Sequence, residues 1–376
     1  MSKLKDLYRK SDWYTVFHFE DDRGKARSNL LFASITQTVI SGLTTGVFYS
    51  GYLSTFGINI VSISVLTLIP YVTSFLSMLA PVILERFKKR RKVLTVARLL
   101  YYTINILGPT LLPLLIADQG KRLAGMVVLV FLANGINALF SSGYSAWHMG
   151  YIDPEIRSAY MTACNIISTA VSGILMLSLG AVTDQLEGPS QQVLLAAFRC
   201  GAFALALLDT YFMQKPREPE YKTGTGTKIS LVSTFRVPLS NKRFMLIMSV
   251  YALHQLVGCL INSVVNTWLL ESVKVSYAYI SFINMTPIFF MLPTSALWGR
   301  FVRKRGNLWT LAILELFSSV ALFAHAFMTE SNYIWVMSLV KLIQNCVVIG
   351  IQFTVGSLIY IALPEEDRNL GGSSHG

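Results

Sequence analysis

Long apolar runs alternate with short polar loops along the whole chain. An α-helix needs roughly 20 apolar residues to cross about 30 Å of hydrocarbon, and ten runs of suitable length are present. They cover residues 29–53, 60–84, 93–117, 123–147, 159–183, 193–213, 244–270, 277–298, 308–328 and 333–363. The runs are continuously apolar and do not alternate with period two, which favours helices over a β-barrel. The pattern therefore predicts an all-α membrane protein.

Composition supports a membrane location. The chain has 376 residues, of which 53% are hydrophobic and 14% charged, and its mean hydropathy is +0.51. These values lie far outside the range of a water-soluble globule. The first 27 residues are polar, so we expect no cleavable signal peptide and assign the insertion signal to the first apolar run. All four cysteines fall within predicted spans, so no disulfide framework is expected.

Cationic residues are distributed unevenly between the loops. The stretch "ERFKKRRK", Glu85 to Lys92, carries six cationic side chains between two apolar runs. If the N-terminus lies inside, one face of the membrane receives 26 Lys and Arg residues and the opposite face three. This bias predicts a cytoplasmic N-terminus and central loop. It also accounts for the net charge of +12 without a nucleic-acid partner.

The chain contains an internal repeat. The segment "ERFKKRRKVLTVARLLYY" aligns with "GRFVRKRGNLWTLAILELF", about 215 residues later, and "DPEIR" aligns with "PEEDR" at a similar distance. We therefore predict two parallel repeats of six spans, the second with only four spans present. The expected parts are a cytoplasmic segment 1–28, a six-helix bundle 29–213, a cytoplasmic linker 214–243, a four-helix bundle 244–368 and a flexible tail 369–376. Both a fragment of a longer chain and a natural ten-span protein are compatible with this pattern.

The cationic loop of each repeat carries a family motif. In the first repeat Glu85 and Arg86 are followed by Lys89 and Arg90, and in the second Gly299 is followed by Arg300, Arg303 and Lys304. This order resembles a loop motif of the major facilitator superfamily, although the two glycine positions of the motif are Pro81 and Lys88 here. The resemblance implies two parallel six-helix bundles and alternating access. It also implies that this loop acts as a gate. The other interpretation is that the loop only sets the orientation of the chain in the membrane.

By the same resemblance, the first, fourth, seventh and tenth spans line a central cavity. Polar groups facing lipid are costly, so polar residues in these spans are the candidate substrate-binding residues. They are Gln37 in the first span, Asn134 and Asn137 in the fourth, His254 and Gln255 in the seventh, and Lys341, Gln344 and Asn345 in the tenth. Hydrogen bonds between helices would explain the amides equally well.

The charged residues within the spans have competing interpretations. Lys341 either forms a structural pair with Glu315 or attracts an anionic or polar substrate group. His254 either carries a coupling proton or stays neutral and bonded to a neighbouring helix. Arg98 is expected to extend to the inner surface without a ligand role. Arg199 is deeply placed and has no evident partner in the sequence.

The sequence favours transport over catalysis. No phosphate-binding glycine loop, metal-ligand cluster or nucleophile and base pair occurs at useful spacing, so neither an enzyme nor a cofactor is expected. We predict a secondary active transporter that moves a small organic solute across the cell membrane by alternating access, with a proton or another ion as a possible coupling partner. The alternative is a transport-inactive membrane sensor or assembly subunit with the same fold.

Overall fold

The computed structural model describes residues 14, 16–17, 21–87, 89–153, 155–218 and 242–362. All regular structure in these residues is helical, and each of the ten predicted apolar runs contains helix. Seven helical segments are long and apolar enough to cross a membrane, and a shorter apolar helix covers Tyr333–Val348. The predicted all-α membrane fold is confirmed for this part of the chain.

The chain divides into two compact units. The first combines residues 1–225 with 263–272 and 276–285, and the second combines 226–262, 273–275 and 286–376. The sequence suggested a division at the loop 214–243, whereas packing assigns the end of the seventh run and the start of the eighth to the first unit. Residues 219–241 of the expected linker and the expected tail 369–376 lie outside the described residues.

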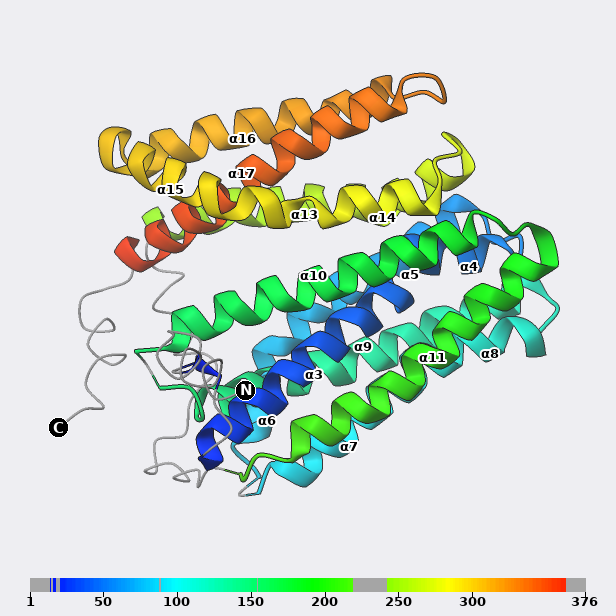
Figure 1. Ribbon diagram of the computed structural model, residues 1–376, viewed down its shortest axis with the longest axis horizontal. Helices are drawn as coiled ribbons and strands as arrows, with labels where there is room; N and C mark the ends of the chain where they lie inside the picture. Colours follow the sequence, from blue (N-terminus) through cyan, green and yellow to red (C-terminus); the bar gives the residue numbers. More distant parts are fainter. Residues whose placement is uncertain are drawn as a thin grey trace, which may run out of the picture. The chain divides into compact units, whose positions relative to one another are not determined.

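The first unit contains most of the helices (Figure 1). In chain order they are α3 (Asp22–Thr44), α4 (Gly46–Ser54), α5 (Ile60–Thr73), the 3₁₀ helix η1 (Ser74–Leu79), α6 (Ala80–Leu84), α7 (Arg91–Tyr102), the π-helix η2 (Thr103–Leu107), α8 (Gly108–Leu115), α9 (Gln119–Met149), α10 (Arg157–Thr183), α11 (Gly188–Gln214) and α14 (Tyr277–Met285). Helix α3 packs against α10 and α11, and α9 packs against the segments from α5 to α8.

The second unit is built on three helices and part of a fourth. These are α13 (Lys242–Glu271), whose C-terminal residues 263–271 belong to the first unit, and α15 (Pro287–Arg305), α16 (Asn307–Ala324) with the 3₁₀ turn η3 (His325–Phe327), and α17 (Tyr333–Ala362). Leu314, Val347 and Ile351 form the centre of its apolar core. The indole of Trp298 packs on this core and donates a hydrogen bond to the Cys346 carbonyl at 2.6 Å.

Helix α14 is tied to the first unit by its N-terminus. The Asp184 carboxylate, at the end of α10, accepts hydrogen bonds from the backbone N–H groups of Tyr277 at 2.7 Å and Ala278 at 2.9 Å. A carboxylate at this end of a helix satisfies free N–H donors and complements the helix dipole. The Tyr277 ring also stacks on Phe48 of α4, with ring centroids 5.9 Å apart. Helix α14 therefore lies along α10, as Figure 1 shows.

The first three predicted spans are interrupted helices, and their breaks have identifiable causes. Pro70 lies in α5 four residues before η1, and Pro109 is the second residue of α8, two residues after the end of η2. Proline cannot donate the N–H of an α-helical hydrogen bond, so 3₁₀ or π geometry is common near it. The first span breaks without proline: Thr45 is extended, and Gly46 has a φ of +61°. Only glycine adopts that conformation without steric cost.

We expect Gly46→Ala to lower the free energy of unfolding by about 1–2 kcal/mol, the cost of a left-handed conformation for a residue with a Cβ atom. A Cβ at this position would meet no atom closer than 3.9 Å, so backbone strain is the only penalty. The matched control is Gly201→Ala in α11, where a Cβ meets nothing within 4 Å and φ is not positive; this change should leave stability unchanged or raise it. Thermal unfolding of the detergent-solubilised protein measures both, and equal effects would contradict this account of the break.

Candidate functional site

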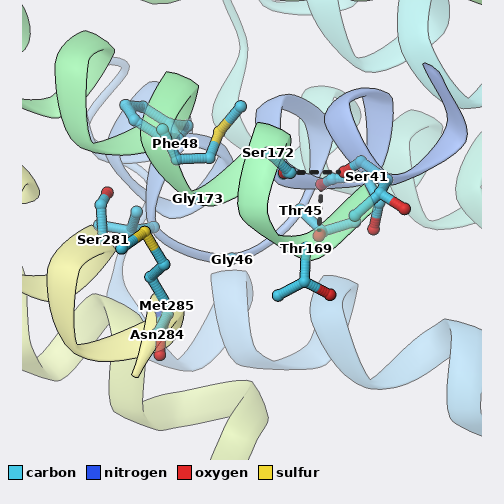
Figure 2. Close-up of a pocket in the computed structure, with 14 residues that line it drawn as sticks. Ser41, Thr45, Gly46, Phe48, Thr169, Ser172, Gly173, Ser281, Asn284 and Met285 are labelled. Atoms are coloured by element: carbon cyan, nitrogen blue, oxygen red, sulfur yellow. Dashed lines mark hydrogen bonds between the residues drawn. The ribbon is translucent and has the colours of Figure 1, made fainter. Parts of the chain in front are cut away.

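A cavity of about 300 Å³ lies beside the break between α3 and α4 (Figure 2). Its lining comes from α3, α4, α10 and α14 of the first unit and is rich in hydroxyl groups and methionine. The lining residues are Thr38, Ser41, Gly42, Thr45, Gly46, Val47, Phe48, Thr169, Ser172, Gly173, Met176, Ser281, Asn284 and Met285. A volume of this size is at the lower end of the range for small-molecule sites.

The polar groups of this cavity are only partly occupied by hydrogen bonds within the protein. The hydroxyl of Thr45 donates to the Ser41 carbonyl at 2.7 Å, and that of Ser172 donates to the Thr38 carbonyl at 3.4 Å (Figure 2). Ser281 is 4% exposed, and its Oγ has no hydrogen-bond partner in the part of the chain that the structure describes. A buried hydroxyl without a partner costs free energy. The cavity can therefore gain stability by accepting a polar ligand.

A second cavity of about 110 Å³ adjoins the same break. Ser41 and Thr45 line both cavities. The full lining of the smaller one is Gln37, Ile40, Ser41, Thr44, Thr45, Arg98, Tyr101, Tyr102, Asn105, Ile106 and Asn137. The structure thus brings the candidates Gln37 and Asn137 together. The third candidate amide of the first unit, Asn134, is buried. It donates to the Asn105 side-chain oxygen at 3.2 Å and to the Val130 carbonyl at 2.8 Å.

Arg98 does not extend to the inner surface, and that prediction was wrong. Its side chain is 7% exposed, and its Nε donates to Oδ2 of Asp209 at 2.6 Å. Asp209 of α11 is completely buried and also accepts a hydrogen bond from the Tyr102 hydroxyl at 2.6 Å. A buried carboxylate attracts the guanidinium more strongly than the lipid headgroups can. The sequence reasoning passed over Asp209, whose position near the end of a predicted span was the available signal.

Arg199 has partners that the sequence did not reveal. It is 1% exposed and lies over the rings of Tyr49 and Tyr52, 4.8 and 5.4 Å from their centroids. Its guanidinium donates to the Thr110 hydroxyl at 2.6 Å and to backbone carbonyls at both helix breaks, those of Thr44, Asn105 and Ile106 at 3.5, 3.3 and 3.2 Å. In a regular α-helix the N–H of residue 109 would donate to the Asn105 carbonyl, but residue 109 is a proline and has no N–H. Arg199 therefore holds α11 against the interrupted first and third spans.

The second unit contains a different pair from the one considered in the sequence. Nδ1 of His254 lies 2.7 Å from Oε2 of Glu315, and the second carboxylate oxygen, Oε1, is buried and has no hydrogen-bond partner among the described residues. The Lys341–Glu315 pair does not form, since Glu315 faces α13 and no ion pair of Lys341 is found among the described residues. Lys341 is half-buried.

The remaining candidates of the second unit lie in varied surroundings. Asn345 is buried, and its amide donates to the Thr286 hydroxyl at 2.8 Å. Gln344 is half-buried, and Gln255 is exposed. No group of three or more His, Cys, Asp or Glu side chains that could hold a metal ion occurs in the residues that the structure describes.

The candidate gating residues lie mostly on the surface. Glu85, Arg86, Lys89, Arg300 and Arg303 are exposed, and Arg90 is half-buried. A carboxylate does cap a helix end here, but it comes from Glu218, after α11. Its Oε1 accepts the backbone N–H of Arg91 at 3.1 Å and that of Arg90 at the start of α7. Glu218 thus caps the start of α7 through charge-assisted hydrogen bonds, whereas Glu85 is exposed.

Comparison with known proteins identifies a matching family and solved structures with a similar fold. The sequence model of the Major Facilitator Superfamily matches residues 30–372. Among solved structures, the nucleoside transporter NupG is similar with a TM-score of 0.66 and 13% identity, over 92% of this chain and 85% of that chain. A bacterial homologue of the iron transporter ferroportin in the inward-facing state has a TM-score of 0.58 and 15% identity, over 93% and 87%.

A third similar structure is a bacterial homologue of the human lysosomal transporter Spinster, with a TM-score of 0.58 and 14% identity, over 92% of this chain and 80% of that chain. No curated protein sequence matches the chain. At these levels of identity the solved structures show a shared fold.

We expect Arg199→Leu to destabilise the protein, because an unsatisfied buried carbonyl costs about 1–3 kcal/mol. Pro109→Ala in the same chain should recover part of the loss, since an alanine at this position supplies an N–H close to the Asn105 carbonyl. Pro113→Ala is the matched control. An alanine N–H at position 113 would reach the Pro109 carbonyl, and Arg199 makes no described hydrogen bond to that carbonyl. Thermal unfolding of the single and double variants gives the coupling energy. Equal effects of the two proline substitutions would refute the assigned role of Arg199.

Proposed function

The chain belongs to the Major Facilitator Superfamily and is a multi-pass membrane transporter rather than an enzyme, and we propose that it moves a small organic solute by alternating access. In this mechanism a solute site opens to each side of the membrane in turn. The energy comes from a solute or ion gradient.

One observation carries the proposal: the first span breaks at Thr45 and Gly46 beside a cavity lined by hydroxyl groups. Irregular backbone at membrane depth is tolerated where it lines a cavity or is buried in protein. Discontinuous helices form the substrate sites of several secondary transporters. Gln37 and Asn137 contribute amides to the smaller cavity beside this break, and Asn134 bonds to Asn105, which lines the same cavity. In the second unit we propose Lys341, Gln344, Asn345, His254 and Gln255 as further substrate-binding residues.

The similar structures belong to proteins described as transporting nucleosides or iron, or as related to a lysosomal transporter. Because their described solutes differ so widely, the fold does not select the solute. The solute class must come from the residues of the cavities themselves.

The coupling ion in this proposal is a proton bound by His254 and Glu315. An imidazole and a carboxylate 2.7 Å apart can share a proton within a membrane-spanning unit. The neighbouring cation of the same unit, Lys341, makes no ion pair with the described residues. Its charge therefore does not neutralise Glu315 by direct contact.

The orientation in this proposal follows from the loop charges. A cytoplasmic N-terminus leaves 26 Lys and Arg residues on the inner face and three on the outer face. The cell membrane is the proposed location, and the partners are the solute, the coupling proton and lipid, without nucleic acid. The cationic loop from Glu85 to Lys92 lies on the inner face in this orientation, where its contact with Glu218 serves as a gate.

Proteoliposomes test the transport function. Reconstituted protein should take up at least one member of a mixed panel of polyols, nucleosides and organic acids above the level of empty liposomes, measured by mass spectrometry. Uptake should accelerate when the same solute is present inside, as expected of a carrier with one alternating site. Ser41→Phe should abolish uptake at equal protein amount, because Ser41 lines both cavities.

Ser178→Phe is the matched control for that substitution. Ser178 is exposed on α10 and lines neither cavity, so its replacement should leave uptake unchanged. Uptake no greater than that of empty liposomes, or equal loss in the two variants, would contradict the proposal.

The proton-coupling proposal predicts that uptake into proteoliposomes rises as the external pH falls from 8 to 5. His254→Gln should flatten this pH profile, because an amide cannot take up the proton. The control is His325→Gln, since the His325 ring is hydrogen-bonded to the Ala321 and Leu322 carbonyls, has Lys341 as its neighbouring charge and forms no ion pair with a described carboxylate. A pH profile of His254→Gln identical to that of the unsubstituted protein would assign His254 a neutral, structural role.

A further inference from the structure

The smaller cavity contains a cation whose donors are not all used. Arg98 lines this cavity, and its Nη2 is buried without a hydrogen-bond partner among the described residues. The guanidinium lies against the Tyr144 ring, 4.9 Å from its centroid. A guanidinium has five N–H donors, and Nε alone is bonded to Asp209. Arg98 therefore brings to the wall of this cavity a guanidinium whose donors are not all paired among the described residues.

The carboxylate partner of Arg98 is, in contrast, well supplied with donors. Asp209 accepts from Nε of Arg98 and the hydroxyl of Tyr102, each at 2.6 Å, and the Thr36 hydroxyl lies 3.5 Å from its Oδ1. These donors surround a side chain with no exposed surface. Within this cluster Asp209 therefore has enough hydrogen-bond donors, whereas Arg98 has too few acceptors.

The charge of the surrounding helices points the same way. Arg199 has hydroxyl, carbonyl and aromatic partners but no described carboxylate at hydrogen-bond distance. The three carbonyls that it binds, those of Thr44, Asn105 and Ile106, all belong to residues that line the smaller cavity. The buried charges of α7 and α11 are two arginines and one aspartate, which leaves one positive charge. In a medium of low dielectric constant such an excess favours an anionic ligand.

The larger cavity suits a different part of the same ligand. It shares Ser41 and Thr45 with the smaller cavity, so one molecule can extend from one cavity to the other across the break. Its side chains are hydroxyl-bearing, and the buried Oγ of Ser281 has no partner. Hydroxyl groups on a ligand both donate and accept, which matches a lining of serine and threonine.

We propose that the solute is a small hydroxylated organic anion, with its carboxylate on Arg98 in the smaller cavity and its hydroxyl groups in the larger one. This inference rests on the proposed function, because it names the class of solute that the transporter carries. Arg98 is then a substrate-binding residue, and Asp209 is a positioning residue that holds the guanidinium at the edge of the cavity.

Two matched pairs of probes test the carboxylate directly: gluconate against sorbitol, and glycerate against glycerol, at equal ionic strength. The members of each pair have the same number of carbon atoms and differ mainly in the carboxylate. Calorimetry measures binding to the purified protein in nanodiscs. In at least one pair the acid should bind at least about tenfold more tightly than the polyol, because a hydrogen bond to a charged group contributes that much affinity. This comparison needs no variant and is independent of any folding defect.

Variants then assign the preference to Arg98. Asp209→Asn frees the guanidinium and should tighten binding of the preferred acid. The double variant Arg98→Gln, Asp209→Asn removes both charges and should bind acid and polyol equally. Asn137→Leu narrows the cavity without altering the pair and should weaken binding of the acid. A purely structural role for Arg98 predicts instead that these variants lower thermal stability but leave the ratio of acid to polyol affinity unchanged.

The possible outcomes separate this inference from the proposed function. If neither acid binds more tightly than its polyol, or if the double variant keeps the preference, the anion assignment is overturned while transport of a neutral solute stands. If no probe binds and no solute of the mixed panel is taken up, both the inference and the proposed function fail. Preference for an acid that is lost in the double variant supports the inference.

Discussion

A helix that breaks inside a bilayer leaves backbone carbonyls without donors, and water is not available to replace them. The first unit meets this constraint with the buried guanidinium of Arg199, which reaches carbonyls at the breaks of the first and third spans. Its planar fork suits several acceptors at once, and the rings of Tyr49 and Tyr52 cover its faces. The positions of α3, α4 and α11 around the cavities depend on these contacts.

The same breaks generate the features that resemble a binding site. The extended Thr45 and the left-handed Gly46 turn the chain where both cavities meet. Arg98 and Asp209 then bring a charged cluster to the wall of the smaller cavity. Stability and function are linked here, since the groups that hold the broken helices also determine the electrostatic character of the cavities.

The sequence predicted the helical class, and each of the ten predicted apolar runs contains helix, because apolar runs of about 20 residues have few alternatives in a membrane protein. It predicted the breaks less well. Pro70 and Pro109 were visible in the sequence, but proline inside a span is compatible with a continuous helix, and Gly46 is one of 25 glycines. The side chains of Gln37 and Asn137 were selected for their polarity and meet at one cavity.

The partners of charged residues could not be deduced from the sequence, because they depend on which helices pack together. Arg98 and Asp209 are separated by 111 positions, and His254 and Glu315 by 61. Depth within a span suggested Lys341 for Glu315, but depth does not specify the face of a helix. The contact of Glu218 with α7 depends equally on tertiary structure, since nothing local distinguishes it from Glu85.

The central claim is that the break of the first span lines a cavity open to each side of the membrane in turn. Reactivity of a Ser41→Cys thiol tests it most directly, in a background where Cys164, Cys200, Cys259 and Cys346 are replaced by serine. A membrane-impermeant maleimide should label this thiol from either side in separate experiments, and a transported solute should slow the labelling. Labelling from neither side, or at a rate that such a solute does not change, would contradict the account.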